Sequence, residues 1–219
     1  MTELLPDAVA ALPATPLADA VIEVVRPVES QSVFNHSVRS YLFARLVADR
    51  LAVFDYDDDL LFAACVMHDL GVATDGAHQE RFEVEGAERA AGFLTQQGIS
   101  TANADQVWQA IALHTSPGIA EHRGELCVLL RAGVAVDFGG PIGAEHVEAI
   151  TDEQAATIHA AYPRLNMVRS LTDAIVAQAA KNPTKNAPVP SVPADFLRER
   201  AADGETRLER ASRSSRWGN

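Results

Sequence analysis

Cysteine is scarce in this sequence of 219 residues, where only Cys65 and Cys127 occur, each inside an apolar run. Two isolated cysteines give no disulfide framework, so both are interpreted as small buried hydrophobic residues. This usage is typical of a reducing compartment. The N-terminus carries acids and no basic segment, so it does not resemble a signal peptide, and a cytoplasmic location is expected.

Basic residues and long apolar runs are also few. Lys and Arg number 18 against 30 Asp and Glu, which gives a net charge of −12. Because nucleic-acid binding needs clustered Lys and Arg, no nucleic-acid partner is expected. No run reaches the ~18 apolar residues of a membrane span, so no membrane partner is expected either. The length suits one well-cored domain.

Helical periodicity runs through most of the chain, which predicts an all-α fold. The expected helices cover residues 16–26, 32–52, 57–70, 80–98, 103–116, 124–140, 151–161 and 166–180. The apolar run 128–136 is ambiguous, because a buried strand can have the same pattern. The helical segments around it favour a helix.

The predicted organisation is one helical domain with two flanking segments. Residues 1–16 form a Pro- and Ala-rich lead-in, and residues 17–182 form the domain. Residues 183–219 are a Pro-rich extension with a short helix over 194–211 and a frayed end.

His68 and Asp69 are the first candidate metal ligands. They stand at the end of a buried helix, and imidazole and carboxylate are both strong ligands for divalent ions. His36 is a second candidate, although a histidine on an apolar helix face is more often a satisfied core residue.

Asp137 is the third candidate, because it ends an apolar run where an unpaired carboxylate would be costly to bury. A cation would remove that cost. So would a helix-capping role or an arginine partner such as Arg131.

Together these residues resemble the HD superfamily of metal-dependent hydrolases over about residues 30–140. His36 stands in an N-H-S-x-R context, His68 and Asp69 begin H-D-L-G, and Asp137 ends R-A-G-x-A-x-D. The resemblance implies a single-domain helical bundle of the HD type, with these four residues around one divalent ion. Zinc is the first expectation, and Mn, Fe, Ni or Co would also accept two His and two Asp.

The resemblance also bears on the number of ions. Many members hold two metals, and one extra ligand stands four residues before a Gly-Ala pair. Here that pair is Gly86-Ala87 and the position is Phe82, which cannot bind a metal, so one ion is expected. His114 remains where two-metal members place another ligand and is interpreted as a polar group facing the substrate.

Four longer segments are similar to the cyanamide-hydratase-like branch of the superfamily. They are RFEVEGAERAAGFL, ALHTS, RAGVAVDFGG and KNPTKN, within a match over about residues 31–186. The branch implies addition of water to the C≡N bond of cyanamide, which gives urea. The expected partner is therefore a small-molecule substrate, and a homo-oligomer is compatible with the sequence.

Three residues are candidates for proton transfer. Asp69 would lie beside the activated water, and His114 would donate a proton to the developing nitrogen. Glu83 would point into the pocket as a general acid or base, or would belong to a solvated acidic face.

Other side chains are expected to shape the pocket. Phe82 and Phe62, with Val66 and Leu113, would leave a small, dry cavity for a compact substrate. Arg39 would orient Asp69 or the substrate, or pair with a surface acid.

Two other functions fit the same motifs. The first is hydrolysis of a nucleotide or other small phosphomonoester. A phosphate needs Lys or Arg nearby, and segments 60–80 and 100–140 contain only Arg123 and Arg131. The second is a non-catalytic, metal-sensing HD domain.

Overall fold

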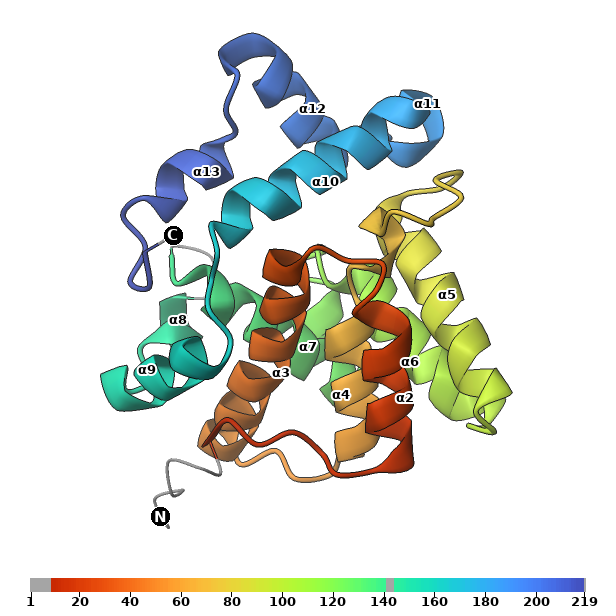
Figure 1. Ribbon diagram of the computed structural model, residues 1–219, viewed down its shortest axis with the longest axis vertical. Coiled ribbons are helices and arrows are strands. Elements are labelled where there is room, and N and C mark those ends of the chain that lie inside the picture. The colour runs from red at the N-terminus through yellow and green to blue at the C-terminus, as the bar shows by residue number, and fades with distance from the viewer. Residues whose placement is uncertain (1–8, 141–143, 219) are drawn as a thin grey trace.

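The computed structural model describes residues 9–140 and 144–218, and these form helices and turns without a strand (Figure 1). The all-α prediction is confirmed, and the ambiguous run 128–136 is helical. None of the described helices is both long and apolar enough to cross a bilayer. The elements in chain order are α2 (Pro16–Val25), α3 (Gln31–Leu51), α4 (Asp58–Met67), the 3-10 turn η1 (Leu70–Val72), α5 (Phe82–Gln96), α6 (Thr101–Leu113), the 3-10 turn η2 (Ala120–His122), α7 (Glu125–Phe138), α8 (Ala144–Val147), α9 (Asp152–Ala161), α10 (Met167–Lys181), α11 (Pro183–Asn186), α12 (Val192–Asp203) and α13 (Arg207–Ser212).

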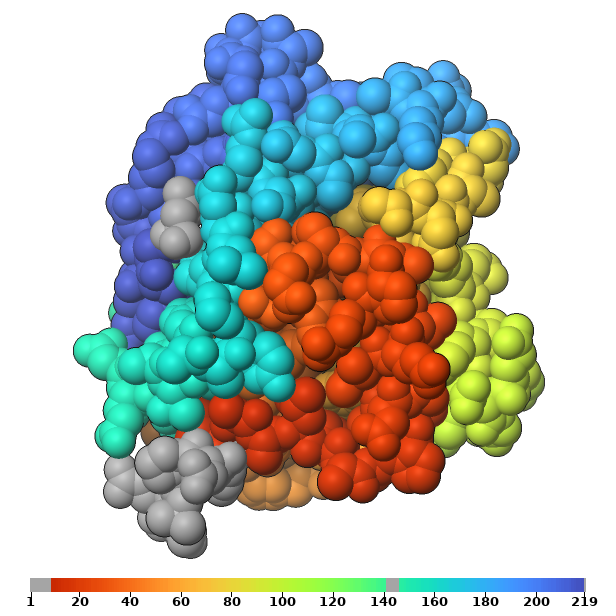
Figure 2. Space-filling view, in the orientation of Figure 1, coloured from red at the N-terminus to blue at the C-terminus, as the bar shows by residue number. Residues whose placement is uncertain are grey.

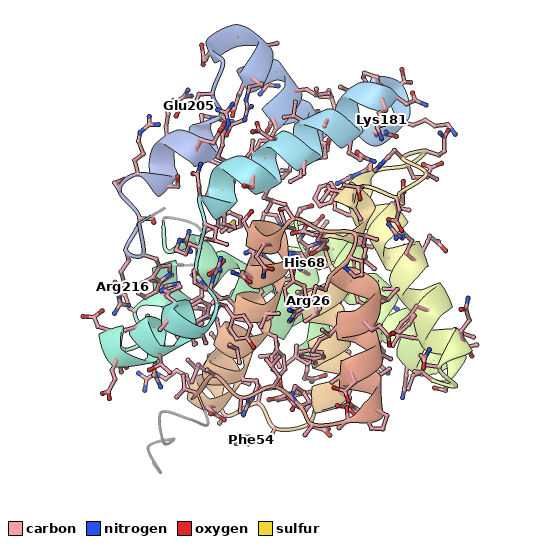
Figure 3. The ribbon with its side chains drawn as sticks, in the orientation of Figure 1. Arg26, Phe54, His68, Lys181, Glu205 and Arg216 are labelled. Carbon is pink, nitrogen blue, oxygen red and sulfur yellow. The ribbon has the colours of Figure 1, made fainter. Side chains whose placement is uncertain are left out.

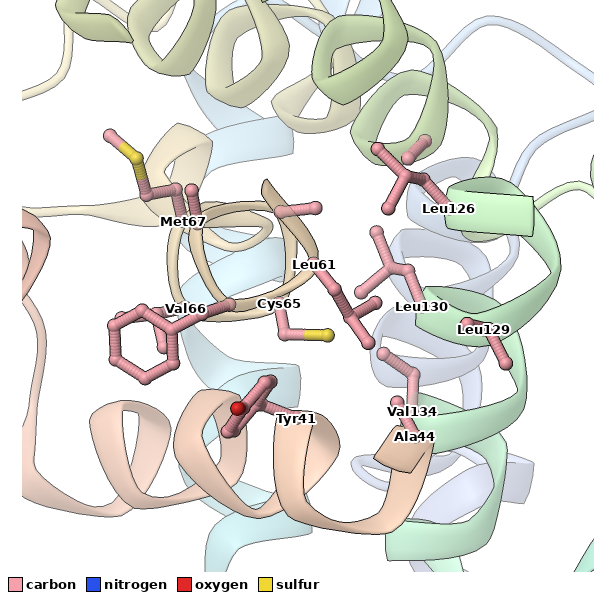
Figure 4. Packing of buried hydrophobic residues seen from close by; sticks show 14 of the residues in the cluster. Tyr41, Ala44, Leu61, Cys65, Val66, Met67, Leu126, Leu129, Leu130 and Val134 are labelled. Atoms are coloured by element: carbon pink, nitrogen blue, oxygen red, sulfur yellow. The ribbon is translucent and has the colours of Figure 1, made fainter. Parts of the chain in front are cut away.

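Helices α3, α4 and α7 meet in the main hydrophobic core. Every residue of α4 from Leu60 to Met67 is buried, because this helix is covered by neighbours on all sides. Figure 4 shows side chains of α3, α4 and α7 converging, with Cys65 among them. Both cysteines are free and buried, as the sequence predicts.

Two glycines let helices approach each other closely around this core. A Cβ added at Gly133 on α7 would lie 2.1 Å from the carbonyl oxygen of Ser40 on α3. A Cβ added at Gly71 would lie 1.9 Å from the carbonyl oxygen of Phe82 at the start of α5. Both distances are far below van der Waals contact, so these positions exclude any side chain. The close α3–α7 contact brings the polar residues of the two helices within hydrogen-bond reach.

The C-terminal helices form a second layer. Helices α10, α12 and α13 lie across one end of the bundle (Figure 1), and they cover that end in the space-filling view (Figure 2). The helix predicted over 194–211 is in fact two helices, so that prediction is wrong. Gly204, with φ +70°, ends α12 in a left-handed turn, and Thr206 with Glu209 forms a capping box that begins α13.

Residues 212–218 are packed against the helices, whereas the sequence predicts that residues 212–219 are frayed. The indole Nε1 of Trp217 donates to the carbonyl of Val136 at 2.6 Å, and the ring stacks on Phe43 with centroids 6.1 Å apart. The backbone N–H of Arg216 donates to the carbonyl of Gly139. Trp217 and Arg216 together therefore tie the described part of this segment, through Gly218, to the end of α7.

The α3–α7 approach gives a test of the fold. Gly133→Ala should lower the free energy of unfolding by about 2–3 kcal/mol, because the backbone oxygen of Ser40 cannot move aside as a flexible side chain would. Urea unfolding followed by circular dichroism measures the change.

The matched control is Gly92→Ala, at an exposed position in α5 with nothing within 4 Å of an added Cβ. This variant should be neutral or gain up to about 1 kcal/mol, because alanine favours a helix over glycine. Equal effects of the two substitutions would contradict the close approach at Gly133.

Candidate metal centre

Three predicted ligands converge at one buried point. His36 lies on α3, His68 follows the last residue of α4, and Asp69 precedes η1. One donor atom from each lies within 4.8 Å of the others. Asp69 Oδ2 is 3.1 Å from His68 Nε2 and 3.8 Å from His36 Nε2. Figure 3 shows His68 in the interior of the protein.

The hydrogen bonds of the two histidines determine their tautomers. His68 Nδ1 lies 2.7 Å from the carbonyl oxygen of Cys65, which can only accept, so Nδ1 carries the hydrogen. His36 Nδ1 donates in the same way to Asp137 Oδ2 at 2.7 Å. In the neutral rings both Nε2 atoms are therefore lone-pair donors that face Asp69. Fixing an imidazole through its far nitrogen is the usual support for a metal-binding histidine.

The electrostatics of the cluster also fit a cation. His36 Nε2 and Asp69 Oδ2 are buried and have no hydrogen-bond partner among the described residues. Burial lowers the pKa of His36 despite the opposing effect of Asp137, which favours the neutral ring. For Asp69 burial alone would raise the pKa, but His68 and His36 outweigh it and lower the pKa to about 2. Two imidazole nitrogens and a carboxylate oxygen form a donor set suited to a divalent ion such as zinc.

Asp137 is not part of this cluster, contrary to the prediction that it is a ligand. Its two oxygens accept hydrogen bonds from Arg39, with Nε to Oδ1 at 2.7 Å and Nη2 to Oδ2 at 2.8 Å. Burial would raise the pKa of Asp137, but Arg39, the His159 ring at 3.9 Å and the hydrogen bonds from His36 and Arg39 hold it well below the ordinary value. The buried carboxylate is thus satisfied by protein cations and supports His36 from behind.

The role predicted for Arg39, orienting Asp69 or the substrate, is also wrong. The guanidinium is fully buried, and its third nitrogen donates to the carbonyls of Tyr162 at 3.0 Å and Pro163 at 3.2 Å. Arg39 lies about one turn after His36 on α3, so the planar fork reaches Asp137 across the α3–α7 contact. No nitrogen of this side chain is left for a substrate.

His114 lies beside the cluster, directly after α6. Its ring centroid is 4.9 Å from that of His68, and its Nδ1 donates to the carbonyl of Ile111 at 2.6 Å. Burial and the neighbouring His68 lower the pKa of His114 to about 4. The ring is therefore neutral at pH 7 and has a free lone pair on Nε2, so it is a proton acceptor in the resting protein.

Glu83 has neither of the two positions considered for it. Its side chain is fully buried, so it is not on a solvated face, and it is not among the residues that line the cavity at the candidate metal ligands. Arg81 Nη2 and Thr115 Oγ1 each donate to Glu83 Oε1 at 2.7 Å. Glu83 holds the start of α5 to Thr115, which does line the cavity.

The carboxyl group of Glu29 is also buried, and the sequence does not indicate it as a site residue. Both carboxylate oxygens of Glu29, between α2 and α3, are buried without a hydrogen-bond partner in the described part of the chain. Burial and the nearby Asp69 raise its pKa well above the usual value. A neutral Glu29 leaves Asp69 as the negative charge of the cluster.

A cavity of about 280 Å³ opens at the three candidate metal ligands His36, His68 and Asp69, which we call the metal cluster. Phe82 lines it, as expected, and contacts His114 with ring centroids 5.6 Å apart. Phe62, Val66 and Leu113 do not line it, so their predicted role is wrong. Phe62 instead packs edge-on against Tyr41 in the core. Because α4 is buried all round, the apolar pattern does not tell which of its faces meets the site.

Another wall of the cavity comes from the C-terminal helices, most of which the sequence predicts to be an extension outside the domain. All the residues of this wall are apolar. Leu171 and Ile175 lie on α10, Val192 and Phe196 lie on α12, and Leu208 lies on α13. The four-residue spacing of 171 with 175 and of 192 with 196 is a sequence signal for one helix face. That signal does not reveal what the face covers.

The family comparison agrees with the geometry. A family model described as the HD domain matches residues 33–180, about two thirds of the chain, and this range includes the whole cluster. The sequence has no significant match among curated proteins.

Metal binding should stabilise the fold through His68. Zinc at about 100 times its dissociation constant should add about 2.7 kcal/mol to the free energy of unfolding, because only the folded chain brings the ligands together. His68→Ala should lose this gain in a thermal melt. His122→Ala removes an exposed histidine of η2 and should keep it; a His68→Ala protein that binds zinc like the unmodified chain would contradict the assignment.

Removing the carboxylate behind His36 should weaken metal binding without abolishing it. Asp137→Asn should raise the dissociation constant about 10- to 100-fold, the usual effect of losing such a support. Competition with a chelator, on protein shown by circular dichroism to be folded, measures this constant. A loss as complete as that of His68→Ala would show that Asp137 itself binds the ion.

Proposed function

Because this chain belongs to the HD domain family and has the fold of a metal-dependent hydrolase, we propose that it adds water to the carbon–nitrogen triple bond of a nitrile-type substrate. Cyanamide, which would give urea, is the parent compound of this class. The proposal depends on one observation above all: the cavity at the metal cluster has almost no free positive charge.

Arg131 is the one Lys or Arg among the described residues that line the cavity. It is occupied, because its Nε pairs with Glu121 and its Nη1 donates to the carbonyl of His114 at 3.1 Å. Arg39 is bound to Asp137. Apart from the ion itself, a phosphomonoester would find no cationic side chain free to neutralise its charge in this largely apolar cavity, at a high desolvation cost. A neutral substrate avoids that cost.

The cluster residues would hold one divalent ion and leave room for water. When bound, the ion supplies a positive charge and water with a pKa lowered towards 7. Asp69, ionised and without a hydrogen-bond partner on Oδ2, orients that water. One ion per chain follows from Phe82, whose ring lies against His114 where two-metal relatives are expected to have a ligand.

His114 would act as a proton relay rather than as a resting acid. Its Nε2 lone pair takes one proton from water as the oxygen bonds to the nitrile carbon. One π bond of C≡N opens at the same time, and His114 returns the proton to the nitrogen that gains the electron pair. The product is an isourea from cyanamide or an imidic acid from other nitriles, and tautomerisation gives urea or the amide. No leaving group departs, so one relay suffices.

Urea formation tests the proposal. Zinc-loaded protein should convert cyanamide to urea, and His114→Ala should reduce kcat/KM by about 10²- to 10⁴-fold, the usual contribution of a proton-transfer group. His122→Ala is the control at an exposed histidine. Elemental analysis of the same sample should give one metal equivalent, and two tightly bound equivalents would contradict the single site.

Two results would replace the proposal. Phosphate release from nucleoside monophosphates without urea formation would favour the phosphohydrolase alternative. Tight zinc binding with neither reaction would favour a metal-sensing domain.

A further inference from the structure

The cavity is larger than the parent substrate needs. Its volume is about 280 Å³, and one water-sized atom takes about 30 Å³, so it has room for roughly nine non-hydrogen atoms, of which the ion and its water would take about two. Cyanamide has three. The unused space lies against carbon, because the walls away from the metal cluster are almost entirely apolar side chains.

The metal ligands all come from the bundle, whereas the C-terminal helices contribute only apolar side chains to the cavity. His36, His68, Asp69 and His114 come from the bundle and its loops. Leu171, Ile175 and Phe196 face them from the C-terminal helices and are each at least nine-tenths buried. These three residues belong to a second hydrophobic cluster that also contains Phe82. A substrate whose reacting group lies at the metal ligands therefore places its other end against these hydrophobic side chains.

We propose that the natural substrate carries a neutral hydrocarbon group of about four carbons on the nitrile or cyanamide function. This group fills the apolar chamber formed by Phe82, Leu171, Ile175, Val192, Phe196 and Leu208. The inference rests on the proposed function for the reacting end of the substrate and on the chamber for the other end. Apolar surface buried there contributes in proportion to its area, about fourfold in affinity or kcat/KM for each methylene.

Two series of compounds separate the chamber from the reaction. The first series is cyanamide and its N-alkyl derivatives from methyl to hexyl, and kcat/KM for formation of the corresponding urea measures the reaction. Alkyl hydroxamates of the same chain lengths bind metals without being hydrated, and calorimetry on zinc-loaded protein reads their affinity. In the unmodified protein both quantities should rise by about fourfold per methylene up to butyl or longer.

Filling the chamber should remove this dependence. Val192→Trp places an indole in the cavity wall, and the dependence of hydroxamate affinity on chain length should become flat. Val189→Trp is the matched control, since Val189 is 81% exposed on the same extension, and it should keep the rise. Leu208→Trp, at a partly buried position, serves as a second filling variant if Val192→Trp does not fold.

The outcomes distinguish the two proposals. Hydroxamate affinity that rises with chain length, without urea formation from any cyanamide, keeps the chamber and rejects the reaction. Cyanamide hydration that is fastest for the unsubstituted compound, with flat hydroxamate affinity, keeps the reaction and overturns the chamber. A rise that persists in both filling variants would also overturn it.

Discussion

The buried charge of Asp137 is the constraint around which the site is built. An ionised carboxylate inside an apolar helix needs compensation, and leaving one unpaired costs about 3–5 kcal/mol. Arg39 supplies it through two hydrogen bonds, and Arg164 adds a third contact at 3.3 Å. These bonds join α3 to α7 and to the segment before α10. His36 donates its Nδ1 hydrogen to the same carboxylate, so the tautomer that exposes a metal-binding Nε2 is set by the interaction that holds the helices together.

The same interaction explains the electrostatic character of the cavity. The arginines nearest to the metal cluster are engaged by carboxylates: Arg39 and Arg164 by Asp137, Arg131 by Glu121, and Arg81 by Glu83. Each of these charges has a carboxylate partner within the protein, and among the four arginines only Arg131 lines the cavity. A cavity with a metal cluster at one end and hydrocarbon at the other can select a neutral molecule, even though the chain contains many basic residues.

The sequence predicts the helices and the cluster of His36, His68 and Asp69 well, because helical periodicity and the H-D motif are local patterns. It does not predict the partner of Asp137. A carboxylate that ends an apolar run looks the same whether a metal or an arginine compensates it, and Arg39 is distant in the chain. The sequence wrongly predicts that Phe62, Val66 and Leu113 line the cavity, for a related reason. Where a helix is buried on every side, composition cannot distinguish the face at the site from the face in the core. Phe196 and Leu208 were missed because apolar residues in a short terminal helix indicate packing without naming the surface they cover.

The candidate metal ligands and half of the apolar wall of the cavity therefore come from different parts of the chain. The candidate ligands and His114 lie between α3 and α7 in the chain, and they are held by the main core and by the Asp137–Arg39 pair. Half of the apolar residues that line the cavity lie on α10, α12 and α13, and their side chains pack in a second hydrophobic cluster. Because the two clusters share few side chains, the volume and shape of the wall can change without moving His36, His68 or Asp69. If the proposed function holds, the C-terminal helices would set the size of the substrate that fits beside the metal ligands.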